Sequence, residues 1–225
     1  VYKRQLFRKA RDQAVITLLQ HTGARRVEIA SITLSSTREA MLMKYPMLKL
    51  VTVKRGEVFI REVPINTIAL NDVKIYISVR AKLANSFPHS KNDFLFISET
   101  TGHPIAVETI GSGISRIRIA AGIEEQACAH MFRHAFISNL FTLLIERHKF
   151  ESKDEFETAL INDEVFLKKV QEWTGHKSLS SLRTYLTQVF SYDKTVNKTV
   201  YGVHETQTLK SVSYTHLTLP TTERV

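Results

Sequence analysis

One pair of β-branched-rich runs, set within a sequence of otherwise mostly helical periodicity, constrains the fold of this chain most strongly. Leu48–Val53 and Val58–Val63 are joined by Lys54–Glu57, and Pro64 follows the second run. Two such runs around a short loop that contains glycine predict a β-hairpin. We therefore expect a mainly α fold with a small antiparallel β-sheet on one side, an α+β architecture.

Apolar residues at helical spacing occupy most of the remaining sequence. The spacing predicts helices over Leu6–His21, Arg25–Ser31, Asn66–Ala84, Val107–Ala121, Met131–His148, Asp154–Leu160, Glu164–Trp173 and Ser178–Val189. Gly23 is a stop signal for the first helix, and Asn66 or Thr67 can cap the third. Phe94–Ile97 is typical of a short buried strand, and we expect the charge-rich Lys149–Asp163 to be a solvated excursion.

Composition narrows the class of protein. The 225 residues allow one domain or two small ones, and a hydrophobic content of 43% suffices for a packed core. No apolar run approaches the roughly 18 residues of a membrane span and no signal peptide is evident, so we expect a cytoplasmic protein without a membrane partner. Cys128 is the only cysteine, which excludes a disulfide framework, and we expect it to be a small buried residue.

The charge balance favours a polyanionic partner, with nucleic acid first. The formal net charge is +9 and the isoelectric point is near 9.7.

Both ends of the chain resemble translated sequencing-adapter DNA. Back-translated, residues 1–5 resemble the transposase mosaic end used to prepare sequencing libraries. Val212–Thr221 resemble the reverse complement of the same end, running on into its adapter. We therefore expect residues 6–210 to be natural sequence truncated at both ends, and residues 1–5 and 211–225 to be adapter-derived. The alternative is a genuine basic start and a genuine Thr-rich tail.

Two histidines and an arginine form the first group of candidate site residues. His130 and Arg133 are three residues apart, so on a helix they share one face and can bind one anion. His134 follows directly. The ordinary alternative is a surface histidine beside an arginine in an ion pair.

A second group combines Gly175 and His176 with Tyr185, nine residues after the histidine. A histidine at a turn and a tyrosine on the next helix can meet at one site. The alternative is a glycine that caps a helix and a tyrosine in the core.

Arg25 and Lys54 are candidates because of where they fall. Arg25 follows the helix break at Gly23, where its guanidinium can bind a phosphate and Glu28, three residues on, can orient it. Lys54 stands at the tip of the predicted hairpin, where it can reach a DNA groove or an active site. A plain ion pair for Arg25 and a solvated lysine are the alternatives.

In this order, Arg, Lys, His-x-x-Arg, Gly-His and Tyr resemble the catalytic domain of tyrosine recombinases, the phage-type integrases. The resemblance runs from Asp12 to Val189. The motifs that carry it are T-G-A-R-R-V-E (Thr22–Glu28), the V-K-R-G hairpin before V-P-I (Val63–Ile65), H-M-F-R-H (His130–His134) and T-G-H-x8-Y (Thr174–Tyr185). The resemblance implies the catalytic-domain fold of these DNA breaking-rejoining enzymes.

The resemblance also implies roles for the candidate residues. Arg25 and Arg133 bind the scissile phosphate, with His176 as a third donor. Tyr185 is the nucleophile that forms a covalent 3′-phosphotyrosyl link, and His130 transfers a proton or binds the phosphate.

The resemblance implies roles for three further residues. Lys54 is the expected general acid for the leaving 5′ oxygen, with Lys49 and Arg55 as alternatives because hairpin lengths vary in this family. His134 and Glu28 support the site.

The chain departs from the usual family pattern at three places. Thr174 replaces the usual leucine before Gly-His, Arg26 stands where an apolar residue is more usual, and Lys149–Asp163 is an insertion relative to compact members. The N-terminal core-binding domain of the family is missing, which we attribute to truncation.

The function implied by the resemblance is that of a site-specific recombinase or integrase of a mobile genetic element. It predicts double-stranded DNA as the partner, a homotetramer in the full-length parent, a nucleoid-associated location, and chemistry without cofactor, metal or ATP. Two alternatives remain: relaxation of DNA by a type IB topoisomerase-like enzyme, and a DNA-binding accessory protein that has lost cleavage.

Overall fold

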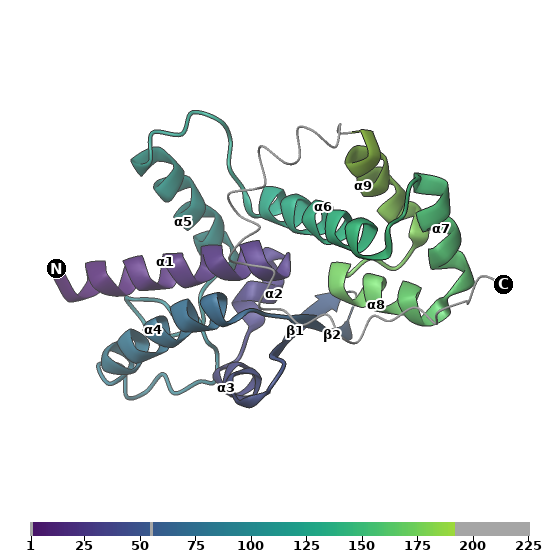
Figure 1. Ribbon diagram of the computed structural model, residues 1–225. Helices are drawn as coiled ribbons and strands as arrows, with labels where there is room; N and C mark the ends of the chain where they lie inside the picture. The colour runs from purple at the N-terminus through teal and green to yellow at the C-terminus, as the bar shows by residue number, and fades with distance from the viewer. Residues whose placement is uncertain (1, 55, 192–225) are drawn as a thin grey trace. The chain divides into compact units, whose positions relative to one another are not determined.

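The computed structural model describes residues 2–54 and 56–191, and the chain divides into two compact units (Figure 1). The first unit is Val1–Phe136 and the second begins at Ile137, so the boundary falls within helix α6 (Ala129–His148). The predicted adapter-derived segment 211–225 lies outside the described residues, whereas residues 2–5 lie in helix α1 (Tyr2–Thr22). Each unit is described below by itself.

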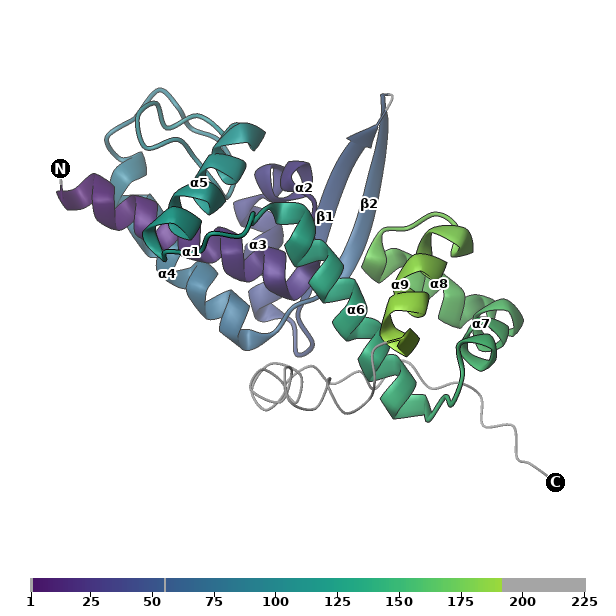
Figure 2. The same cartoon turned by 90° about the horizontal axis from the view of Figure 1, so that it is seen from above.

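Helices surround the core of the first unit. α1 packs along α4 (Thr67–Ala84), and α5 (Val107–Ala120) contacts both α1 and α2 (Arg26–Ser31) (Figures 1 and 2). The Asn66 side chain caps α4 by accepting a hydrogen bond from the backbone N–H of Ala69, as predicted. The largest fully buried side chains of this core include Phe7, Leu18, Leu19, Ile29, Tyr76 and Phe96.

The predicted hairpin is confirmed. β1 (Met47–Lys54) and β2 (Glu57–Pro64) are antiparallel, and Lys54 pairs with Glu57, so the connection has two residues rather than the expected four. Leu48, Leu50 and Val63 are fully buried at the base of the hairpin, whose far end projects away from the helices of the unit (Figure 2). One end of the hairpin is therefore anchored in the core, whereas Val53 and Val58, near its other end, are exposed.

Two features of the first unit differ from the sequence-based expectations. Helix α3 (Leu34–Leu42) is not predicted by the hydrophobic pattern; it begins where the Thr33 hydroxyl accepts a hydrogen bond from the backbone N–H of Ser36. The strand predicted over Phe94–Ile97 is wrong, because this segment forms only the isolated bridges Thr33↔Phe94 and Ile97↔Pro104. Its burial was correctly predicted for Leu95–Ile97, which are inaccessible to solvent.

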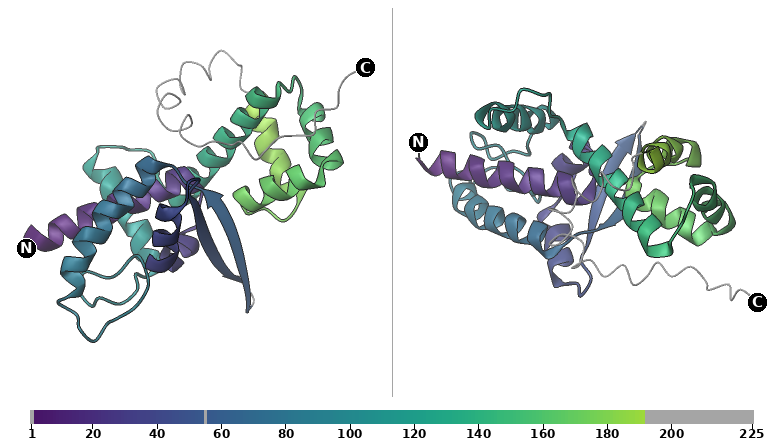
Figure 3. Two further views of the ribbon diagram at one scale, coloured as in Figure 1. Left: turned by 60° about the horizontal axis from the view of Figure 1, so that its bottom comes forward. Right: turned by 45° about the horizontal axis from the view of Figure 1, so that its top comes forward.

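The second unit consists of the C-terminal part of α6 with α7 (Lys153–Asn162), α8 (Glu164–Thr174) and α9 (Leu179–Ser191) (Figure 3). Four phenylalanines pack as neighbouring rings at its centre: Phe141, Phe150, Phe156 and Phe166. The expectation that Lys149–Asp163 is a solvated excursion is wrong, since Phe156 and Leu160 are fully buried. These residues are four apart, so the apolar face of α7 points inward, and Asp154 and Glu155 remain exposed.

No helix among residues 2–54 and 56–191 has both the length and the apolar character that crossing a bilayer demands.

The turn after α1 depends on Gly23. Its φ is +57°, and its N–H donates to the carbonyl of Leu19 at 3.1 Å. A Cβ at this position would lie 2.4 Å from Cδ1 of Phe136, so both the backbone conformation and the packing require glycine.

The variant Gly23→Ala tests this requirement. We expect it to lower the free energy of unfolding by about 2–5 kcal/mol, because the left-handed backbone and the clash with Phe136 both oppose a methyl group. Urea denaturation measures the change. The matched control is Gly122→Ala, where φ is +67° and nothing lies within 4 Å of the added Cβ, with an expected loss of about 1–2 kcal/mol. Equal losses in the two variants would contradict the role of the Phe136 contact.

Candidate functional site

Arg25 is placed at the start of α2, directly after the turn that ends α1. Its backbone N–H donates to Oε2 of Glu28 at 2.7 Å, and its side-chain Nη1 donates to Oε1 of the same residue at 3.2 Å. The predicted contact between Arg25 and Glu28 is thus confirmed. The Arg25 side chain remains 39% exposed, so an anion can reach it.

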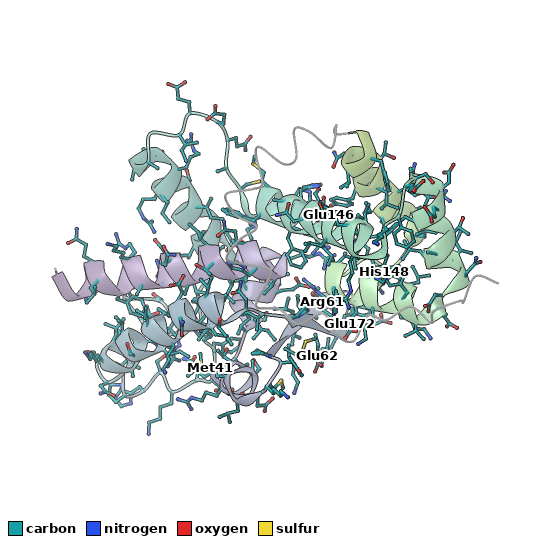
Figure 4. All side chains as sticks on the ribbon, in the orientation of Figure 1. Met41, Arg61, Glu62, Glu146, His148 and Glu172 are labelled. Carbon is teal, nitrogen blue, oxygen red and sulfur yellow. The ribbon has the colours of Figure 1, made fainter. Side chains whose placement is uncertain are left out.

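Glu28 is a carboxylate that is 1% exposed, and its ionised form is held by two residues of the hairpin. Arg61 on β2 donates Nε to Oε1 at 3.0 Å and Nη2 to Oε2 at 2.9 Å, and the Thr52 hydroxyl on β1 donates to Oε1 at 2.8 Å. Arg61 is labelled in Figure 4.

These contacts decide the charge state of Glu28. Burial by itself raises the pKa of this carboxyl, but the hydrogen bonds and charge of Arg61, the N–H of Arg25 and the hydroxyl of Thr52 outweigh burial and lower the pKa to about 2. Glu28 is therefore a carboxylate at neutral pH.

The roles of Arg61 and Thr52 were not predicted from the sequence. The available signal was alternation along the strand: Arg61 shares a face of β2 with Val63, which is fully buried. A charged residue on the core face of a strand requires a buried partner, and Glu28 supplies it.

Arg133 is anchored to the same turn as Arg25. It lies in the first part of α6, is 4% exposed, and donates Nη1 to the carbonyl oxygen of Gly23 at 2.8 Å. Gly23 is two residues before Arg25. The structure thus brings the two predicted phosphate-binding arginines to one backbone turn of the first unit.

His130 and His134 contact each other on α6. Their Nε2 atoms are 2.6 Å apart and their rings are perpendicular, with centroids 4.1 Å apart. One ring donates and the other accepts, so at least one of the two is neutral in this arrangement. Burial lowers the pKa of His134, and the charges of His130 and Arg133 act in the same direction. His134 therefore holds the ring of His130, consistent with a supporting role.

Cys128 precedes this helix and is only partly buried, so the expectation of a buried cysteine is wrong. The residues before it, Ile123–Gln126, are exposed in the linker between α5 and α6, which leaves no closed core around the thiol.

His176 and Tyr185 are neighbours in the second unit. Gly175 ends α8 in the left-handed conformation with φ +65°, as a helix-capping glycine does, and His176 follows it. The ring centroids of His176 and Tyr185 are 5.6 Å apart. Tyr185 is 6% exposed and packs edge-on against Phe141, so its ring has a fixed place on α9.

Thr174 takes the position where the family usually has leucine. It is fully buried, and its hydroxyl donates to the carbonyl of Val170 at 2.7 Å. This local hydrogen bond satisfies the polar group, so the substitution is compatible with the buried end of α8.

The lysine candidates differ in what the structure describes. Lys54 is the last residue of β1, and its side chain and Arg55 lie outside the described residues. Lys49 lies on the opposite face of the strand from Thr52 and donates to Oε2 of Glu39 at 3.0 Å.

Across residues 2–54 and 56–191, no three or more His, Cys, Asp or Glu side chains gather in a way that could hold a metal ion.

The variant Glu28→Gln tests the buried carboxylate through its pH dependence. Because the folded pKa is about 2 and the ordinary value is 4.5, the charge of Glu28 contributes stability above pH 4.5 that is lost as the pH falls toward 2. We expect the wild type to exceed Glu28→Gln by about 3 kcal/mol in free energy of unfolding at pH 7, and the gap to close between pH 4.5 and pH 2. Exposed Glu125→Gln serves as the control for general acid effects. A gap between wild type and Glu28→Gln that stays constant with pH would contradict the assignment.

Comparison with known proteins places these features in a family. The sequence model of the phage integrase family matches residues 5–149. Among curated proteins, the chain is 28% identical over 177 residues to tyrosine recombinase XerC of Alcanivorax borkumensis, covering 78% of this chain and 47% of that protein. It is 28% identical over 178 residues to tyrosine recombinase XerD of Shewanella oneidensis, covering 79% and 49%. The chain thus spans about half the length of these relatives.

Solved structures show the same fold. XerH site-specific recombinase bound to its palindromic difH substrate matches with a TM-score of 0.56 at 21% identity, covering 89% of this chain and 51% of that one. XerA recombinase matches with a TM-score of 0.54 at 18% identity, covering 91% and 63%. The predicted tyrosine recombinase catalytic-domain fold is therefore confirmed. Because the family model covers more than half of the sequence, this chain belongs to the phage integrase family.

Proposed function

We propose that this chain is the catalytic part of a site-specific DNA recombinase that cleaves and rejoins strands through Tyr185. The family match, together with the local geometry of the candidate residues, supports the proposal. Arg25 and Arg133 are anchored at one turn, and the His176 ring adjoins the Tyr185 ring. The names of the XerC and XerD relatives support recombination over relaxation of DNA.

In the proposed cleavage step, the Tyr185 hydroxyl oxygen attacks the scissile phosphorus and the bond from phosphorus to the 5′ oxygen breaks. The phenolic proton passes to His130, and the leaving 5′ oxygen takes a proton from Lys54. The products are a 3′-phosphotyrosyl link and a free 5′ hydroxyl. Attack by the 5′ hydroxyl of a second strand reverses the step, restores a phosphodiester and regenerates the phenol. Because the 3′-phosphotyrosyl bond retains the free energy of the phosphodiester that was cleaved, strand exchange requires no ATP.

In this proposal the cationic groups accelerate the cleavage step. Attack on a phosphodiester concentrates negative charge on its oxygens, and directional donors fixed beforehand stabilise that charge. Arg25, Arg133 and His176 are the proposed donors. The first two are held by backbone and carboxylate contacts before any substrate binds, so no reorganisation of these arginines is needed at the moment of reaction.

Lys54 is favoured over Lys49 as the general acid. Lys49 is bonded to Glu39 on the opposite strand face from Thr52, whereas Lys54 ends β1 two residues beyond Thr52, which binds Glu28. We assign the acid to the hairpin end that continues from the Arg25–Glu28 cluster.

Double-stranded DNA is the proposed partner, and the net charge of +9 supports contacts with its backbone that weaken steeply with salt. We further propose that the full-length parent acts as a homotetramer without a cofactor. Residues 1–5 and 211–225 remain proposed adapter sequence, and the nucleoid-associated cytoplasmic location remains a prediction.

The nucleophile is tested with a pool of random-sequence duplexes that carry 5′-bridging phosphorothiolates, whose thiol leaving group religates poorly and traps the adduct. We expect the wild type to form covalent DNA adducts that resist SDS, and Tyr185→Phe to form none while its DNA affinity stays within about threefold. Tyr45→Phe, at a tyrosine that is 42% exposed, is the matched control and should form adducts as the wild type does.

The results separate the alternatives. Adducts with Tyr185→Phe would refute the nucleophile. Binding by the full-length parent without any adduct would support a DNA-binding accessory protein. Relaxation of supercoiled DNA by the parent without exchange between paired sites would support a type IB topoisomerase-like enzyme.

The general acid is tested on a duplex recovered from that pool. A thiolate leaves without a proton, so we expect Lys54→Met to lose about 100-fold in single-turnover cleavage of the ordinary phosphodiester and to recover on the 5′-phosphorothiolate. Lys49→Met should cleave both substrates like the wild type. If the 5′-phosphorothiolate instead restored cleavage by Lys49→Met and not by Lys54→Met, Lys49 would be the general acid.

A further inference from the structure

Arg61 is a buried arginine that takes no part in the proposed cleavage step. It is 8% exposed, sits on β2, and binds both carboxylate oxygens of Glu28 with a planar pair of N–H donors, at 3.0 and 2.9 Å. Such a side-on, two-bond geometry is the strongest that arginine and carboxylate can form. Its burial and this commitment to Glu28 make Arg61 unsuited to contact DNA itself.

The Glu28 carboxylate is shared between two arginines that use it differently. Arg61 holds the bidentate position, whereas Arg25 reaches Oε1 through Nη1 at 3.2 Å and keeps 39% of its side chain exposed. Both guanidinium groups therefore bond to the one carboxylate at the same time, and only the Arg61 side chain bonds to both of its oxygens. Arg61, which bonds to both oxygens, is buried, whereas the Arg25 side chain is partly exposed.

We propose that Arg61 is a positioning residue that occupies the bidentate face of Glu28 and so keeps Arg25 from folding down onto this carboxylate. The inference rests on the proposed function, in which Arg25 binds the scissile phosphate. Without Arg61, the Arg25 guanidinium gains a vacated two-bond partner nearby and is withdrawn from the phosphate. Glu28 orients Arg25 by accepting a hydrogen bond from the Arg25 backbone N–H. Arg61 limits the number of hydrogen bonds that Glu28 can form with the Arg25 side chain.

The same contacts join two elements that carry proposed catalytic groups. The Arg61 and Thr52 bonds to Glu28 attach β2 and β1 to the start of α2. The hairpin, whose first strand ends at Lys54, is thereby fixed to the turn that carries Arg25. Arg61 thus links the strands of the hairpin to the turn that carries the proposed phosphate donor, and it also limits the freedom of that donor.

The first test follows the Arg25 side chain in the DNA-free protein. The NMR signal of its Nε–H group, assigned by its disappearance in Arg25→Lys, reports exchange with water. We expect Arg61→Met to slow this exchange about tenfold, because Arg25 moves into the bidentate position, and Arg61→Met with Glu28→Gln to restore it. Exchange that is unchanged in Arg61→Met overturns the inference, whether or not the chain cleaves DNA.

The second test is single-turnover adduct formation at saturating DNA, at a temperature where circular dichroism shows each variant folded. We expect Arg61→Met to react about tenfold more slowly than the wild type with DNA affinity unchanged, and the double variant with Glu28→Gln to regain at least about threefold. A double variant no faster than Arg61→Met overturns the inference. Absence of adducts with the wild type would refute the proposed function instead.

Two further variants separate positioning from stability. Arg11→Met removes another buried arginine of the first unit, one paired with Asp12 and Glu99, and should lower stability without changing the rate of the folded protein. If Arg61→Met does not fold, Arg61→Lys keeps the charge without the two-bond geometry and carries the same comparisons. Arg61→Lys with wild-type exchange and wild-type rate would also overturn the inference.

Discussion

The buried carboxylate of Glu28 is the interaction on which the first unit depends. With 1% exposure, it would be costly to ionise without partners, and it has them from three elements: Arg61 on β2, Thr52 on β1 and Arg25 at the start of α2. Charges taken out of water tolerate little misalignment. The cluster therefore fixes the hairpin and α2 in one arrangement, which is the rigidity that a preorganised anion site needs.

The turn at Gly23 extends this arrangement to α6. Its left-handed backbone and the ring of Phe136 leave no space for a side chain, and its carbonyl receives Nη1 of Arg133. Arg25 and Arg133, more than 100 residues apart in sequence, are thus held at the same turn of the chain. In the second unit, the aromatic core does the corresponding work: Phe141 holds the ring of Tyr185, and Gly175 turns the chain so that His176 adjoins that ring.

The parts of the structure that depend on local sequence were predictable. The hairpin, most helices and the contact between Arg25 and Glu28 follow from patterns spanning a few residues. The features that were not predicted depend on contacts between residues far apart in the sequence. Arg61 looked like an ordinary strand residue because its partner is 33 positions away. The segment Lys149–Asp163 looked solvated because its charges outnumber the apolar residues that α7 buries.

The burial of a segment was also easier to predict than its pairing with another strand. Leu95–Ile97 are inaccessible as expected, yet they form no strand, since each end of the segment meets its partner at a single bridge. Helix α3 escaped prediction because Thr33 and the serines after it are as typical of turns as of a helix start. That Arg25, Arg133 and Tyr185 act on one phosphate remains a prediction from the family resemblance.

The measurement that tests this central claim most directly is a crystal structure of the chain with a nicked DNA duplex and orthovanadate, which mimics the phosphorus at the moment of transfer. We predict a vanadium bonded to the Tyr185 hydroxyl oxygen, with guanidinium nitrogens of both Arg25 and Arg133 within about 3 Å of the vanadate oxygens. A vanadate bonded to another side chain, or one bonded to Tyr185 with both arginines remote, would contradict the claim.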